Sequence, residues 1–242
     1  MTHQTIKRQR SRIRFDSALV SEHPEQLFLP AQNEALERGS ALFIEHEGVP
    51  LVYKRYHRGG LLGRLITYHY FDRLGRPPRM FREYDLLVRL CERGLPVPRP
   101  VAARCVFTSP ISYRGELVTR RITPAETLTD LLREAPLAER LWAAIGKTLA
   151  DFHAQFVYHA DLNASNILID GREESPVPVH LIDFDKGEIR DPGASRGAAR
   201  ADVDWKQANL QRLRRSLDKL QAADPALHFS ERDWQTLLTH YE

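Results

Sequence analysis

The sequence of 242 residues has little of several features that mark specialised classes of protein. It has only two cysteines, Cys91 and Cys105, and their spacing matches neither a metal site nor a redox motif. This argues against a disulfide framework and favours a reducing cytoplasm. No run of eighteen apolar residues exists, and the basic N-terminus lacks the apolar stretch of a signal peptide. We therefore expect a soluble or peripheral protein.

The chain also lacks a strong net charge, which is +3 at pH 7 with 28% charged residues. The overall charge does not require a nucleic-acid partner, and the basic segments contain no recognisable recognition motif. The basic residues are nevertheless unevenly distributed: Lys7 to Arg14 contains five and no acid, and Lys54 to Arg82 contains eight against the single Asp72. Such segments favour an anionic partner such as phosphate or a membrane surface, although a solvated basic face fits equally well.

Apolar residues make up 42% of the chain, enough for one large domain or for two small lobes around a cleft. Residues 1 to about 40 have the character of a polar lead-in. Short apolar runs bounded by turn residues then predict four strands, the last of which leads into a connection between lobes. These strands cover residues 41–44, 51–56, 101–107 and 115–122.

Apolar residues at helical spacing predict most of the remaining elements. Segment 59–78, rich in Gly, Arg and aromatic residues, is expected to be irregular or partly helical, and segment 191–200, rich in Gly, Ala and Arg, is expected to be a loop. The predicted helices cover residues 80–91, 127–132, 137–152, 204–222 and 231–241.

Lys54 follows an apolar run on the second predicted strand. A phosphotransferase places there the lysine that holds the α- and β-phosphates of its nucleotide, although a lysine on a strand is more often an edge residue. Glu83 and Asp85 flank the apolar stripe of the helix over 80–91 on opposite sides. The helical period does not decide which of the two would face Lys54, and a solvated helix edge remains open for both.

The stretch from Tyr158 to Lys186 carries two short acidic motifs, each attached to an apolar run that predicts a strand. Asp161 is followed five residues later by Asn166, which opens the first run, and the second run ends in Asp183. A hairpin of the two strands would bring these three side chains to one end of a small sheet. This is the arrangement of a phosphotransferase catalytic loop and its metal-binding partner.

The three side chains suit phosphoryl transfer, which needs positioning and charge neutralisation more than covalent chemistry. Asp161 can accept the proton of an acceptor hydroxyl, and Asp183 with the amide oxygen of Asn166 can hold Mg²⁺ between the phosphates. Taken singly, such residues are more often turn formers or caps. We expect His159 to have a structural role by bonding backbone near Asp183, whereas Asp185 suits a further metal ligand and a solvated turn equally.

Six segments spread over most of the chain carry a family resemblance. They are Tyr53 to Tyr56 with Arg58-Gly59-Gly60, Phe81 to Tyr84, Gly94 to Pro98, Thr119 to Ile122, Tyr158 to Asn163 with Asn166 to Leu168, and Asn209 to Leu213 with Arg215 to Leu217. With these segments the sequence resembles the protein-kinase-like superfamily. More narrowly, it resembles the 3-deoxy-D-manno-octulosonic acid (Kdo) kinases of lipopolysaccharide biosynthesis.

The resemblance implies an α+β, protein-kinase-like fold with two lobes in one kinase-like domain. Residues 1–122, including the basic lead-in, would form an N-terminal lobe with a small antiparallel β-sheet and one helix, and residues 123–242 a mainly helical catalytic lobe. The implied activity is ATP-dependent phosphorylation of the 4-hydroxyl of a Kdo residue on the lipid A precursor. The implied enzyme is a monomer at the cytoplasmic face of the bacterial inner membrane, where its basic stretches would meet an anionic, membrane-embedded acceptor.

The resemblance also implies a role for each candidate site residue, with ATP and Mg²⁺ as cofactors. Asp161 would be the catalytic base, and Asn166 and Asp183 the magnesium ligands. Lys54 would bind phosphate and pair with Glu83, which decides between the two carboxylates that the helical period left open.

Several positions depart from the protein-kinase pattern. The chain has no Gly-x-Gly-x-x-Gly loop, only Gly39 and Gly48 around the first hairpin. Ala160 stands where protein kinases usually have Arg, Asn163 where many have a catalytic lysine, and Asp185 where Gly is usual. No Ala-Pro-Glu or long activation segment follows. These differences argue against regulation by activation-loop phosphorylation and favour a small-molecule or glycolipid acceptor.

Two alternatives to a Kdo kinase remain at this point. One is another kinase of the superfamily, acting on heptose or on a protein. The other is a catalytically silent kinase-like module that binds lipid or partner proteins, although such a module has no need of the complete set Lys54, Asp161, Asn166 and Asp183. A nucleic-acid-binding domain is the least favoured hypothesis.

Overall fold

The computed structural model describes residues 2–8, 10–20, 23–28, 41–56, 70–71, 77–109, 112–171, 176–190 and 198–242. The chain forms two compact units, one of Met1–Arg89 with Pro98–Arg121 and one of Leu90–Val97 with Ile122–Glu242. Gly39, the Arg58-Gly59-Gly60 segment and most of the predicted irregular segments 59–78 and 191–200 lie outside the described residues.

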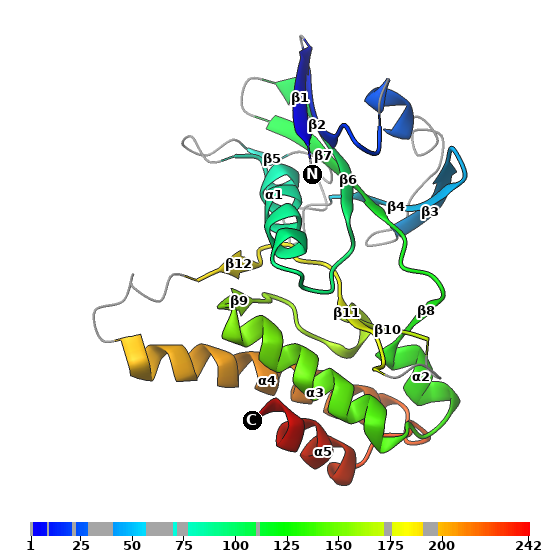
Figure 1. Ribbon diagram of the computed structural model, residues 1–242, viewed down its shortest axis with the longest axis vertical. Helices are drawn as coiled ribbons and strands as arrows, with labels where there is room; N and C mark the ends of the chain where they lie inside the picture. The colour runs from blue at the N-terminus through cyan, green and yellow to red at the C-terminus, as the bar shows by residue number, and fades with distance from the viewer. Residues whose placement is uncertain are drawn as a thin grey trace. The chain divides into compact units, whose positions relative to one another are not determined.

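The described part of the first unit is built on a seven-stranded antiparallel sheet (Figure 1). Its spatial order is β1-β2-β6-β7-β4-β3, and β5 also pairs with β7. The strands are β1 (His3–Arg8), β2 (Ser11–Asp16), β3 (Ala41–His46), β4 (Val49–Arg55), β5 (Tyr70–Phe71), β6 (Pro100–Ser109) and β7 (Ser112–Arg120). All four predicted strands are therefore present, with bounds a few residues different from those expected.

The polar lead-in expected over residues 1–40 is wrong for its first part, since β1 and β2 form a hairpin that extends the sheet beyond β6. In β2 the apolar Ile13 and Phe15 are buried, while Arg12 and Arg14 alternate with them on the opposite face. The strand was missed because two apolar residues among several basic ones give a weak alternating pattern. The short 3-10 helix η1 (Pro24–Phe28) follows and adds two buried residues to the core.

The two faces of this sheet have different partners. One face carries the core formed by Ile13, Phe15, Val20, Leu27, Phe28, Leu51, Tyr53, Val101, Ala102 and Val118. The other face carries α1 (Arg79–Glu92), which confirms the predicted helix over 80–91 and lies alongside the strands in Figure 1. Gly115 of β7 lets α1 approach closely, because a Cβ at this position would lie 1.8 Å from Cε of Met80. Lys54, next to Tyr53 on β4, projects to the α1 face.

The second unit is mainly helical, as expected. Its helices are α2 (Leu128–Glu134), α3 (Glu139–Ala154), α4 (Ala198–Ala223) and α5 (Glu231–Tyr241). Two small sheets accompany them, in the orders β11-β10-β8 and β12-β9. Their strands are β8 (Ala125–Thr127), β9 (Val157–Tyr158), β10 (Ile167–Asp170), β11 (Val179–Leu181) and β12 (Glu188–Ile189). The antiparallel pairing of β10 with β11 confirms the predicted hairpin. Among the described helices, none has the length and apolar character needed to cross a bilayer.

Helix α5 packs along α3 (Figure 1). Gly146 of α3 permits this contact, because a Cβ there would lie 2.2 Å from the carbonyl oxygen of Leu237. Just before the start of α5, the ring of Phe229 packs on Trp142 at a centroid distance of 5.7 Å. The two contacts hold α5 against α3 both near its start and in its second half.

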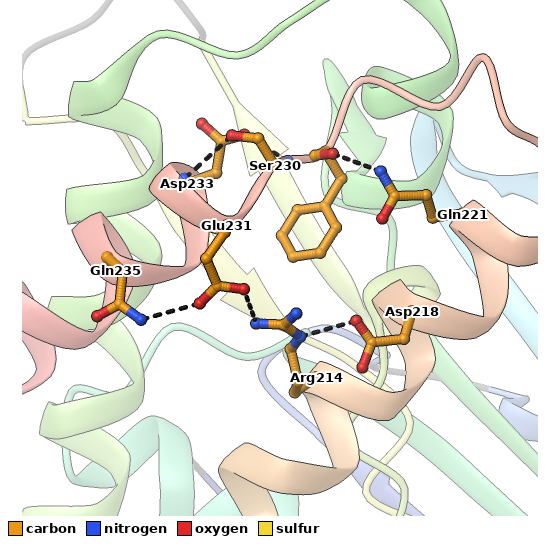
Figure 2. A network of polar contacts seen from close by, with 8 residues as sticks. Arg214, Asp218, Gln221, Ser230, Glu231, Asp233 and Gln235 are labelled. Carbon is orange, nitrogen blue, oxygen red and sulfur yellow. Dashed lines mark hydrogen bonds and ion pairs between the residues drawn. The ribbon is translucent and has the colours of Figure 1, made fainter.

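The N-terminal end of α5 is also attached to α4 by polar contacts, as Figure 2 shows. Arg214 of α4 donates to Asp218 on its own helix at 2.7 Å and to Glu231 on α5 at 2.8 Å. Gln221 of α4 donates to the carbonyl oxygen of Phe229 at 2.6 Å. Ser230 and an acidic residue three positions later form a capping box at the start of α5. The position of α5 is therefore determined by both neighbouring helices.

Candidate active site

In the first unit, the candidate phosphate-binding lysine is held by a buried carboxylate. Nζ of Lys54 lies 3.2 Å from both carboxylate oxygens of Glu83, which is only 4% exposed. Tyr56 donates its hydroxyl to the same carboxylate. A buried charge is costly unless it is paired and hydrogen-bonded, and these two donors satisfy that requirement. Lys54 is thus held at one place on the sheet.

The structure also distinguishes the two carboxylates that flank the apolar stripe of α1. Glu83 pairs with Lys54 of β4, whereas Asp85 pairs with Arg14 of β2. The pairing of Lys54 with Glu83 that the family resemblance implied is therefore present. The helical period alone could not make this choice, because β2 and β4, which have β6 and β7 between them, each offer the helix a basic residue.

In the second unit, Asp161 lies in a loop whose backbone is held by two asparagines. Nδ2 of Asn163 and Nδ2 of Asn166 donate to the carbonyl oxygen of Asp161 at 3.0 Å and 2.9 Å. Asn163 also caps the short 3-10 helix η4 (Ala164–Asn166) by accepting from two backbone N–H groups. The Asp161 side chain itself is exposed. The loop therefore fixes the main chain of Asp161 and leaves its carboxylate at the surface.

Asp183 follows β11 in a conformation that few non-glycine residues adopt, with φ of 61°. The next residue, Phe184, is fully buried and anchors this turn. Its ring stacks on Phe152 of α3 at 5.9 Å and lies 4.7 Å from the ring of His159. Asp183 is exposed beside this anchor. Asp185 lies in the turn that follows and is partly buried.

His159 links the two acidic motifs, which confirms the structural role predicted for it. Its Nε2 lies 2.8 Å from the carbonyl oxygen of Ile182, and its Nδ1 accepts from the backbone N–H of Asp161 at 3.2 Å. Because a carbonyl can only accept, the hydrogen of the neutral ring is on Nε2. One buried ring thus holds the main chain of Asp161 and the residue before Asp183.

Asn209 of α4 is a site residue that reasoning from the sequence did not assign. It is 1% exposed, its Nδ2 donates to the carbonyl oxygen of His159 at 2.8 Å, and its Oδ1 accepts from the His159 N–H at 3.3 Å. The signal was present, since Asn209 lies four residues from both Trp205 and Leu213 and so falls within the apolar stripe of its helix. A polar residue at such a position needs a buried partner.

The oxygen ligands available for a metal ion are few. The described residues contain no group of three or more His, Cys, Asp or Glu side chains placed to bind one. Asn166 and Asp183 would supply one amide and one carboxylate oxygen. The amide nitrogen of Asn166 is engaged by the Asp161 carbonyl, so its oxygen faces away from that bond. Two oxygen ligands suit Mg²⁺, which keeps several of its waters when bound.

Comparison with known proteins is consistent with this geometry. Residues 25–241 match the family model described as "Lipopolysaccharide kinase (Kdo/WaaP) family". The chain is 38% identical over 240 residues to the 3-deoxy-D-manno-octulosonic acid kinase of Vibrio vulnificus (strain YJ016), covering 96% of this chain and 95% of the relative. It is also 38% identical over 239 residues to the protein of the same name from Photobacterium profundum, covering 96% and 94%.

Among solved structures, the chain resembles one titled "WaaP in complex with acyl carrier protein". The TM-score is 0.58 at 20% sequence identity, and the match covers 93% of this chain and 84% of that one. At this identity the likeness concerns the fold, and it agrees with the kinase-like architecture predicted from the sequence. The match of nearly the whole chain to the family model shows that this protein belongs to the lipopolysaccharide kinase (Kdo/WaaP) family.

Proposed function

We propose that this protein is a Kdo kinase that transfers the γ-phosphoryl group of ATP to the 4-hydroxyl of a Kdo residue on the lipid A precursor. The observation that carries the proposal is the loop of Asp161, which presents an exposed carboxylate on a fixed main chain. Relatives named as Kdo kinases, which are 35–38% identical over most of the chain, support the choice of acceptor.

Asp161 acts as the general base in this proposal. The acceptor hydroxyl donates a hydrogen bond to its carboxylate, which orients the oxygen and takes the proton as the bond to phosphorus forms. Its main-chain N–H and carbonyl are both engaged, by His159 and by the two asparagines. The main chain that carries the carboxylate is therefore held by the groups around it.

Lys54 binds the phosphates of ATP in the same proposal. The Glu83 carboxylate and the Tyr56 ring, whose centroid is 4.9 Å from Nζ, hold the ammonium group on the α1 face of the sheet. An ammonium group held in this way neutralises phosphate charge without a reorganisation cost at the moment of transfer.

Asn166 and Asp183 are the proposed magnesium ligands. When bound, the ion neutralises charge on the phosphate oxygens. Asn166 is oriented by its bond to the Asp161 carbonyl, and the residue before Asp183 accepts a hydrogen bond from His159 through its carbonyl oxygen. The base and the metal ligands thus share one hydrogen-bonded framework.

The proposed place of action is the cytoplasmic face of the inner membrane, with the protein acting as a monomer. The hairpin of β1 and β2 supports this location, because Lys7, Arg8 and Arg10 are exposed at and near its turn. Arg8 lies 3.5 Å from a carboxylate oxygen of Glu25, which is a long contact. Exposed cations of this kind attract an anionic glycolipid and the surface that contains it.

The test is to incubate the purified protein with Mg-ATP and Kdo-lipid A precursor in detergent and to detect one added phosphoryl group by mass spectrometry. NMR of the product then checks that the 4-hydroxyl carries it. Heptosylated core and a generic protein acceptor serve as comparisons, and chelation of Mg²⁺ should abolish transfer. Phosphorylation of the heptosylated core with none of the Kdo-lipid A precursor would show that the proposed acceptor is wrong.

A further inference from the structure

A line of buried polar contacts runs from the last turn of α5 to the loop of Asp161. It begins at Tyr241, whose hydroxyl lies 2.7 Å from Nδ1 of His153 on α3. The other ring nitrogen, Nε2, lies 3.3 Å from Oδ1 of Asn209 on α4. Asn209 in turn holds both main-chain polar groups of His159. Three helices therefore meet the loop through one continuous set of hydrogen bonds.

The direction of each bond follows from the chemistry of the groups. His153 is 3% exposed, and burial lowers its pKa to about 4, so the ring is neutral at neutral pH. Oδ1 of Asn209 can only accept, so Nε2 of His153 carries the hydrogen. Nδ1 is then an acceptor, and the hydroxyl of Tyr241 is its donor. Removing that hydroxyl leaves a buried acceptor without its partner.

The packing of α5 does not depend on this hydroxyl. Close packing over Gly146, the contact of Trp142 with Phe229 and the Arg214–Glu231 pair already attach the helix. The hydrogen bond from Tyr241 to His153 is therefore not needed to attach α5. By donating to Nδ1, the Tyr241 hydroxyl restrains the orientation of the His153 ring, whose Nε2–H donates to Asn209.

We propose that Tyr241 is a positioning residue for the catalytic loop, acting through His153 and Asn209 on the main chain of His159, two residues before Asp161. This inference rests on the proposed role of Asp161 as the base. The loop is restrained at two places. The two asparagines bind the carbonyl oxygen of Asp161, and the contacts that begin at Tyr241 bind the main chain of His159, two residues earlier. A base that is held on one side only takes up more orientations, and fewer of them are productive.

Tyr241→Phe tests the inference because it removes the hydroxyl and keeps the ring, which lies edge-on to His153 at 5.5 Å. We expect kcat for Kdo-lipid A precursor to fall about three- to tenfold, the size of one lost hydrogen bond, with KM for ATP changed less than about twofold. In the protein without ATP or acceptor, the amide hydrogens of His159 and Asp161 should exchange faster than in the wild type. Thermal unfolding checks that the variant is folded.

Glu231→Gln is the matched control, because it weakens the contact of Arg214 with the opposite end of α5. It should leave kcat and the exchange of the loop amides unchanged. The inference is overturned if Tyr241→Phe has wild-type kcat, if its loop amides exchange at the wild-type rate, or if Glu231→Gln reproduces its effects. If the wild type itself transfers no phosphate to this acceptor, the proposed function fails instead, and amide exchange still decides whether Tyr241 holds the loop.

Discussion

In the first unit a charged group is held by another charged group, since Nζ of Lys54 lies 3.2 Å from the buried carboxylate of Glu83. In the second unit neutral groups do the holding. An imidazole and amides bind the main chain around Asp161, while its side chain and that of Asp183 are exposed. The first region thus holds the side chain of a candidate site residue, and the second holds the main chain that carries one, with different chemistry.

The difference follows from what each charge is expected to do. Lys54 would stay positive throughout the reaction, so a permanent ion pair orients it at no chemical cost. A general base must accept a proton, and a cation beside it would lower its pKa and weaken it as an acceptor. Holding the base by its main chain avoids this conflict. The comparison predicts large effects wherever a variant removes the base or disturbs the neutral framework behind it.

Asp161→Asn gives the largest expected effect. The amide keeps the size of the side chain and the main-chain contacts of the loop, but it cannot take up the proton. We expect kcat to fall about a thousandfold with the affinity for ATP retained, as steady-state kinetics and calorimetry would show. Asp151→Asn, which changes an exposed carboxylate on α3 of the same unit, is the control and should have wild-type kcat. Retained turnover in Asp161→Asn would show that Asp161 is not the general base.

The second prediction concerns the buried His153, and it is tested by the pH dependence of the free energy of unfolding. Burial lowers the pKa of His153 from the ordinary value of 6.5 to about 4. Between pH 6.5 and 4 this histidine is therefore protonated in the unfolded chain and neutral in the folded protein. The stabilisation is complete above about pH 6.5 and is lost as the pH falls towards 4, by about 3 kcal/mol at that end.

Denaturant unfolding of the wild type and of His153→Phe between pH 7.5 and 4 would measure this as a difference in slope. An unchanged pH dependence in His153→Phe would mean that the framework is not neutral at acidic pH.

Glu83→Gln tests the charged region and gives the smallest of the three effects. The variant removes the carboxylate that orients Lys54. A hydrogen bond to a charged group typically contributes about 1.5–3 kcal/mol of free energy. We expect kcat/KM for ATP to fall about ten- to hundredfold. Asp85→Asn removes the neighbouring carboxylate, which pairs with Arg14, and should change kcat/KM little. Equal losses in the two variants would show that α1 as a whole, and no particular ion pair, supports the site.

Prediction from the sequence succeeded where the signal was local. The hairpin of β10 with β11 and the helices followed from periodicity and motif spacing, and the kinase-like fold followed from the family resemblance. It failed where a local signal was diluted, as in β2, whose two buried apolar residues stand among arginines. The assigned roles of Lys54, Asp161, Asn166 and Asp183 stay predictions, although the Lys54–Glu83 pair and the link from His159 towards Asp183 are present.

The sequence by itself identified the candidate site residues, because residue types and spacings within one loop or strand are set by local geometry. The tertiary structure alone decided how those residues are held. It paired Asp85 with Arg14, and it placed Asn209 on the backbone of a residue 50 positions earlier in the chain. Such contacts depend on where whole helices pack, and packing is a property of the complete fold that no short stretch of sequence contains.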